Sequence, residues 1–165
     1  TMPMVAQNFG AKDHDRVRQS VTLAWSVALG LSLIGAVALE LGGVAVTRLF
    51  TDDPDAIASG AAYLRLAALM MPAYSLMFII TSFFQGVKRP IWSSAIGVYR
   101  QIFGIALFPA LFVAYTDWGL TAVWAGLFVA VWSGFIFAFF LTFMVSRQTI
   151  GGMKLDFAGV REAAP

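Results

Sequence analysis

The sequence predicts an all-α membrane protein whose chain crosses the bilayer four times. Its 165 residues are 59% hydrophobic and 12% charged, whereas soluble domains are about 45–50% apolar and about 25% charged. The apolar residues gather in four runs, each long enough for a helix to cross a hydrocarbon core about 30 Å thick. Lipid cannot satisfy the unpaired backbone groups of open strands, so helices are the structure that these runs can form.

The predicted elements follow one another with short connections. They are a short helix at residues 1–9, transmembrane helices at about 17–49, 54–85, 91–115 and 119–146, and a polar tail at 147–165. Segment 1–9 is too short for the apolar core of a signal peptide and its cleavage site. Because the chain opens at Thr1 without a methionine, we expect this segment to be the end of a helix that begins upstream.

Glycine, proline and aspartate mark the predicted helix ends. We expect Gly10 to take the left-handed conformation that closes the short helix. Asp53 and Pro54 are typical of an N-cap and a first helical position. Gly86 and Pro90 are expected to close one span and to open the next.

Charge predicts the orientation of the helices. The basic clusters are Lys12, Arg16 and Arg18 before the first span, Lys88 and Arg89 between the second and third, and Arg147, Lys154 and Arg161 after the fourth. The other two connections carry Asp52, Asp53, Asp55 and Asp117. Since cytoplasmic loops are enriched in lysine and arginine, we expect a multi-pass protein of the plasma (inner) membrane with both ends of this chain cytoplasmic.

The fourth span carries a stripe of small residues. Ala122, Gly126, Ala130, Gly134 and Ala138 recur at every fourth position. Small side chains let helices approach closely in lipid, where the hydrophobic effect does not draw them together. The stripe therefore predicts a packing seam with another helix.

The second span presents an aromatic and partly polar face. At 100° per residue this face contains Tyr63, Ala67, Met70, Tyr74, Phe78, Thr81 and Gln85. Aromatic rings and methionine suit flat lipophilic cations, but such a face is more typical of a helix interface whose hydroxyls bond to neighbouring helices. The candidate pathway residues here are Tyr63, Met70, Tyr74, Thr81 and Gln85.

Two charged residues lie inside spans. Arg100 is about ten residues, or about 15 Å, into the third span, where it either snorkels back to water or lines a cavity. Glu40, the acid of the first span, is either an interfacial carboxylate or a site for a proton or cation. From Ala56 to Thr116 the sequence has no Asp or Glu, so a coupling ion held by a membrane carboxylate must use Glu40 or residues outside this chain.

Other chemistry has little support in the sequence. The adjacent Asp13, His14 and Asp15 read as a solvated loop, because three neighbouring residues without a cysteine or a second histidine do not close a metal shell. The basic residues form no single face, which argues against nucleic acid. The sequence lacks the catalytic and phosphate-binding motifs of common enzymes, so we expect neither an enzyme, nor a cofactor, nor a metal.

Several motifs together resemble the multidrug and toxin extrusion (MATE) family. Gln7, Asn8, Gly10, Ala11 and Arg16 resemble the cytoplasmic signature of that family. Residues 49–54 resemble its "LF-x-x-D-x" outer loop, and Gln85, Gly86 and Pro90 resemble its "Q-G…P" turn. Arg100 and Pro109 resemble its "R…P" pattern. Their order and spacing cover nearly the whole chain. The four spans match the second half of such a transporter, helices nine to twelve, preceded by a stub of helix eight.

The resemblance implies a fragment of a twelve-helix, two-bundle antiporter. Such a protein exports cationic or aromatic compounds in exchange for protons or sodium ions, and its N-terminal half would be the partner of this chain in the lipid bilayer. Some members carry a carboxylate in the tenth helix, which this chain lacks, so protons coupled through the first half are favoured over sodium. The alternatives are a lipid-linked oligosaccharide flippase of the same superfamily and a non-transporting membrane assembly module.

Overall fold

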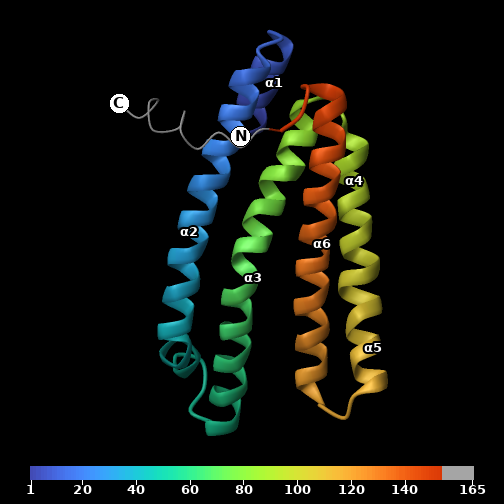
Figure 1. The fold of residues 1–165 in the computed structure, drawn as a ribbon. Coiled ribbons are helices and arrows are strands. Elements are labelled where there is room, and N and C mark those ends of the chain that lie inside the picture. Colours follow the sequence, from blue (N-terminus) through green and yellow to red (C-terminus); the bar gives the residue numbers. More distant parts are fainter. Residues whose placement is uncertain (154–165) are drawn as a thin grey trace.

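The computed structural model describes residues 1–153 as a bundle of helices (Figure 1). The elements are α1 (Met2–Gly10), α2 (His14–Arg48), α3 (Pro54–Gly86), α4 (Pro90–Tyr99), the π-helix η1 (Arg100–Leu107), α5 (Phe108–Tyr115) and α6 (Leu120–Thr149). Four helices are long and apolar enough to cross a membrane: α2, α3, α6 and the continuous span Pro90–Tyr115 formed by α4, η1 and α5. This confirms the predicted fold class. Lys154 and Arg161 of the predicted basic tail lie outside the described residues.

Aspartates begin the two longest helices. Asp53 accepts a hydrogen bond from the Asp55 backbone N–H at 3.1 Å, and Pro54 is the first helical residue, as predicted. Asp13 likewise accepts from the Arg16 N–H at 3.1 Å. His14 and Asp15 therefore belong to the first turn of α2, so the solvated loop expected there is wrong.

The left-handed conformation predicted for Gly10 is also wrong, because Gly10 is the last helical residue of α1 and has no positive φ. Gly86 ends α3 and Pro90 begins α4, as predicted. The left-handed residues are Lys12, with φ 60°, and Lys88, with φ 58°. The following N–H closes each turn: Asp13 donates to the Asn8 carbonyl at 3.0 Å, and Arg89 donates to the Phe84 carbonyl at 2.9 Å. This is the bond of the Schellman motif, formed here around lysine.

Gly86 also lets α1 pack closely against α3. A Cβ at this position would lie 2.5 Å from Cγ1 of Val5, which is fully buried. The main core cluster is at this end of the bundle and also includes Val17 and Val21 of α2, Phe83 and Phe84 of α3, and Val145 of α6. Farther along α2, side chains such as Leu41 are exposed, as expected of a lipid-facing surface.

The small-residue stripe of α6 is a packing seam, as predicted. Ala122, Gly126, Ala130, Gly134 and Ala138 are all buried. A Cβ on Gly126 would lie 2.6 Å from the Pro109 Cα, so α5 packs backbone to backbone against α6. Gly134 faces the Tyr99 ring and the Met77 sulfur.

The third span changes its hydrogen-bond pattern at Arg100. The π-helix η1 runs from Arg100 to Leu107, and the Phe108 N–H donates to the carbonyl of Phe103, five residues earlier. Pro109 follows at once and has no N–H to donate. The proline is thus accommodated by a change of helix type next to the arginine, and irregular helix of this kind is frequent at functional sites.

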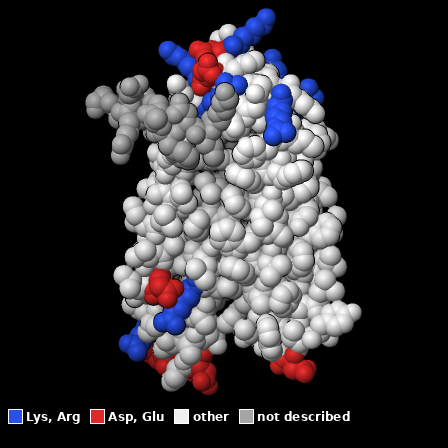
Figure 2. All heavy atoms as spheres, in the orientation of Figure 1, with Lys and Arg blue, Asp and Glu red and all other residues white. Residues whose placement is uncertain are grey.

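Charged side chains lie toward the two ends of the bundle. Figure 2 shows lysines and arginines, with some acids, at the end where α1 lies, and acids, with some basic residues, toward the opposite end; on the face in view an uncharged belt lies between them. The N-terminus and the end of α6 are both at the first of these ends (Figure 1). This arrangement fits four crossings of an apolar layer.

Candidate functional site: a polar cleft beside Arg100

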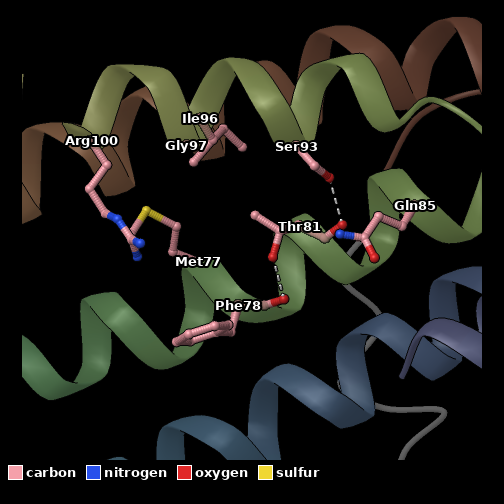
Figure 3. Close-up of a pocket in the computed structure, with 8 residues that line it drawn as sticks. All are labelled: Met77, Phe78, Thr81, Gln85, Ser93, Ile96, Gly97 and Arg100. Atoms are coloured by element: carbon pink, nitrogen blue, oxygen red, sulfur yellow. Dashed lines mark hydrogen bonds between the residues drawn. The ribbon is translucent and has the colours of Figure 1, made fainter. Parts of the chain in front are cut away.

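A cleft of about 220 Å³ opens between α3 and the α4–η1 helix (Figure 3). It is lined by Met77, Phe78, Thr81 and Gln85 from α3 and by Ser93, Ile96, Gly97 and Arg100 from the other side. We call this space the Arg100 cleft. It combines two apolar side chains, an aromatic ring and four polar side chains between helices that are long enough to span the membrane.

Arg100 also borders a second cavity. This cavity, of about 240 Å³, is lined by Tyr74, Arg100, Gly104, Leu127, Ala130 and Val131. We call it the Tyr74 cavity. Arg100 therefore lines both the cleft and the cavity.

Two hydroxyl groups fix the polar end of the Arg100 cleft. Ser93 Oγ donates to the Thr81 carbonyl at 2.9 Å, which ties α4 to α3, and Thr81 Oγ1 donates to the Phe78 carbonyl at 2.9 Å. Both hydroxyl protons are therefore committed to backbone oxygens. The side-chain donors that remain in the cleft are the Gln85 amide and the Arg100 guanidinium.

Arg100 carries a charge that residues 1–153 do not balance. None of the hydrogen bonds or ion pairs within this range involves its guanidinium, and Figure 3 shows the side chain pointing across the cleft toward Met77 of α3. No Asp or Glu occurs between Ala56 and Thr116. Arg100 is thus positioned at a cavity, which was one of the two alternatives left open by the sequence.

The structure separates the predicted pathway residues of α3. Thr81 and Gln85 line the Arg100 cleft and Tyr74 lines the Tyr74 cavity. Met70 is buried in a small core cluster with α6 residues. Tyr63 packs against Trp124 with ring centroids 6.2 Å apart. The residues of this one face have different surroundings because α3 meets different neighbours along its 33 residues.

Glu40 lies apart from the cleft, on α2. Its Oε1 atom is 3.5 Å from Nε of Arg65 on α3, and their side chains are 52% and 59% exposed. An exposed ion pair of this kind contributes about 0–1 kcal/mol. The pair ties α2 to α3 and occupies the acid that was a candidate ion site.

Sequence reasoning missed the α4–η1 side of the cleft. Ser93, Gly97 and Arg100 line the cleft, and Gly104 lines the Tyr74 cavity. These four residues recur at intervals of three and four and so share one face of the helix. Small and polar residues repeating in this way within an apolar span were the available signal. Only Arg100 was singled out from the sequence.

A second unrecognised cluster surrounds Arg18. Its Nε donates to the Gly152 carbonyl at 2.9 Å, NH1 donates to Asp15 Oδ1 at 2.5 Å, and NH2 donates to the Ile150 carbonyl. The side chain is only 18% exposed. Arg18 therefore binds the segment after α6 to the start of α2, and we call this cluster the Arg18 clasp.

Metal chemistry finds no support in the described part of the chain. Across residues 1–153, no group of three or more metal-ligating side chains could hold a metal ion.

The four long apolar helices are those of a multi-pass membrane protein. Consistent with this, the family model described as MatE matches residues 1–110. The chain belongs to the MatE family, which gives it a role in transport.

A solved structure shares the fold. It is described as the inward-facing conformation of a multidrug resistance MATE family transporter of the MOP superfamily, and the match has a TM-score of 0.81 at 18% identity. The alignment covers 99% of this chain and 36% of that one, so the chain spans little more than a third of the length of that transporter. No curated protein sequence matches the chain.

Proposed function

We propose that the chain forms part of a secondary active antiporter that exports cationic or aromatic drugs and toxins in exchange for protons. The single observation that carries the proposal is membership in the MatE family, whose model matches residues 1–110. Drug-sized ligands bind in cavities with mostly apolar walls and a few placed polar groups. The Arg100 cleft, where the exposed Phe78 ring adjoins polar side chains, fits an aromatic substrate.

The chain is proposed to supply helices nine to twelve of a twelve-helix transporter, with α1 as the end of helix eight. Its partner would be the N-terminal half of the same protein, and the substrate pathway would lie between the two halves. The 36% coverage of the matched transporter leaves room for such a half. Gln7, Asn8, Gly10, Ala11 and Arg16 would then mark the cytoplasmic signature of the second half.

Protons are proposed as the coupling ion, with sodium as the alternative. Coupling by a membrane carboxylate requires an acid that can exchange its ion during transport. The spans from Ala56 to Thr116 have no acid, and Glu40 is paired with Arg65. The coupling carboxylate is therefore assigned to the N-terminal half.

The structure weakens both alternative functions. An oligosaccharide flippase should have a strongly basic cavity for its phosphate groups, but Arg65 is paired with Glu40, which leaves Arg100 as the one basic side chain of the described cleft. An assembly module would need packed faces only. The Arg100 cleft is an open space with polar lining, which such a module does not require.

Efflux of ethidium tests the proposal. Membrane vesicles containing the complete protein should export ethidium when a proton gradient is imposed and should stop when a protonophore collapses it. Vesicles containing residues 1–165 alone should show no efflux. No transport by the complete protein would refute the antiporter function, whereas efflux by residues 1–165 alone would refute the assignment as half of a transporter.

A further inference from the structure

Among residues 1–153, no counter-charge pairs with the positive charge of Arg100 in its cleft. Arg100 lies about 15 Å along the helix from the first residue of the span Pro90–Tyr115. This places it near the middle of an apolar layer about 30 Å thick. Charged side chains at such depth face a water-filled cavity or pair with an opposite charge. Glu40 cannot supply that charge, because it pairs with Arg65 on α3 at 3.5 Å.

The free donors of the cleft fit a carboxylate. The guanidinium is a planar fork that binds both oxygens of a carboxylate at once. The Ser93 and Thr81 protons are already donated to backbone carbonyls, which leaves Arg100 and the Gln85 amide to donate to a ligand. A cation would instead meet the repulsion of Arg100 with no acid of the cleft to offset it.

The walls of the cleft fit a flat ring. Phe78 is 64% exposed, and Met77 and Ile96 add apolar surface on the two sides of the cleft. The volume of about 220 Å³ exceeds the ~150 Å³ cavity that holds a benzene molecule. One or two fused rings would therefore fit beside the guanidinium.

We propose that the Arg100 cleft binds aromatic carboxylates, with the acid group on the Arg100 guanidinium and the ring against Phe78 and Met77. This inference rests on the proposed function, because it specifies carboxylates as the aromatic substrates that this cleft would bind; cationic substrates would bind elsewhere in the same transporter. Binding of a phospholipid is disfavoured, since lipid phosphates lie at the membrane surface whereas Arg100 lies mid-span. A carboxylate from another segment of the protein is the competing occupant, and the test distinguishes it.

The test uses three ligands with the same ring and different charge: 2-naphthoate, 2-naphthamide and 2-naphthylmethylammonium. Equilibrium dialysis against the complete purified protein in detergent should show 2-naphthoate binding at least tenfold tighter than the other two. Arg100→Gln should abolish this preference, and Arg100→Lys should reduce it, because an ammonium lacks the planar fork. Arg65→Gln, which removes an arginine outside the cleft, should leave it unchanged.

Two results would overturn the inference. The first is wild-type protein that binds 2-naphthoate no more tightly than the amide or the ammonium ligand. The same result is expected if a carboxylate of the protein already occupies Arg100. Because this comparison uses the wild-type protein, it tests the inference even if Arg100→Gln does not fold. The second is a folded Arg100→Gln protein that keeps the preference. A protein that exports ethidium without preferring 2-naphthoate would refute this inference alone, whereas selective binding without any efflux would refute only the proposed function.

Discussion

At the scale of single residues, Arg16 and Arg18 show that neighbouring arginines can differ in role. Arg16 is 72% exposed and approaches only Asp13, at 3.6 Å. Arg18 is largely buried and donates to two carbonyls beyond α6 as well as to Asp15. The sequence identifies both as cytoplasmic charges, but long-range contacts between residues more than 130 positions apart are visible only in the fold.

Replacing Arg18 should open the Arg18 clasp. Arg18→Ala removes charge-assisted hydrogen bonds that are worth about 1.5–3 kcal/mol, so we expect a loss of that order in the free energy of unfolding, measured by denaturant titration in detergent. Proteolysis near Gly152 should become faster. The matched control is Arg16→Ala, which should change stability by at most about 0.5 kcal/mol; equal losses in both variants would contradict the clasp.

The close contact at Gly86 gives a second prediction. In Gly86→Ala the new methyl group would meet Val5 Cγ1 at 2.5 Å and Val5 Cβ at 2.8 Å. We expect a loss of about 1–3 kcal/mol in stability from overpacking, measured by the same titration. Gly42→Ala is the control, because no atom lies within 4 Å of its Cβ and alanine favours helix by about 1 kcal/mol. An unaffected Gly86→Ala protein would show that α1 can shift at little cost.

Glu40 gives a prediction about coupling. Its carboxylate pairs with Arg65 on the exposed side of α2 and α3, so Glu40→Gln should reduce proton-driven ethidium efflux by less than about fivefold, because an exposed pair is worth only about 0–1 kcal/mol. Efflux in vesicles, with and without a protonophore, measures this. If efflux by the variant no longer depended on the proton gradient, Glu40 would be identified as a site of the coupling ion.

At the scale of helices, the α5–α6 contact depends on Gly126. A Cβ there would lie 2.6 Å from the Pro109 Cα and 2.9 Å from the Phe108 carbonyl carbon, which are backbone atoms that cannot rotate away. Gly126→Ala should therefore lower the midpoint of thermal aggregation in detergent, by more than Gly86→Ala does. Gly134→Ala, on the same stripe, is the control, since its nearest neighbour would be 3.7 Å away; equal shifts would argue against a specific Gly126 contact.

Sequence patterns predicted elements better than they predicted contacts. Long apolar runs identified the four spans because lipid imposes a minimum length on each helix, and Asp53 with Pro54 marked a helix start because those bonds are local. Gly86 was correctly predicted to end a span, but its close contact with α1 was missed because no local pattern reveals it. The π-helix at Arg100 was missed because periodicity assumes a constant 3.6 residues per turn.

The same limit explains the incomplete prediction of the site. Thr81 and Gln85 were found on one face of α3, but the face could not show which neighbour each residue meets. Met70 meets α6 and is buried, whereas Thr81 meets the diverging α4 and lines a cleft. A cleft is defined by two elements, so the repeat of small and polar residues on α4 could indicate one face of that helix but not that this face meets α3.

At the scale of the whole molecule, the charged ends of the bundle predict its orientation in the membrane. Lys12 and Lys88 lie in turns next to α1 and α4, and Asp52 and Asp117 lie in the two connections at the opposite end. Cytoplasmic loops are rich in lysine and arginine, so the lysine turns should face the cytoplasm. Since the chain contains no cysteine, single cysteines can report the side on which each turn lies.

Cysteine labelling in intact cells should therefore divide these four positions into two pairs. We expect Asp52→Cys and Asp117→Cys, in a complete protein otherwise free of cysteine, to react with a membrane-impermeant maleimide added outside. Lys12→Cys and Lys88→Cys should react only after the membrane is permeabilised. The uncharged belt between the two ends (Figure 2) is expected to lie in the membrane, which places these two positions on the cytoplasmic side. Retained efflux controls for folding. Outside labelling of either lysine position would contradict four crossings in this orientation.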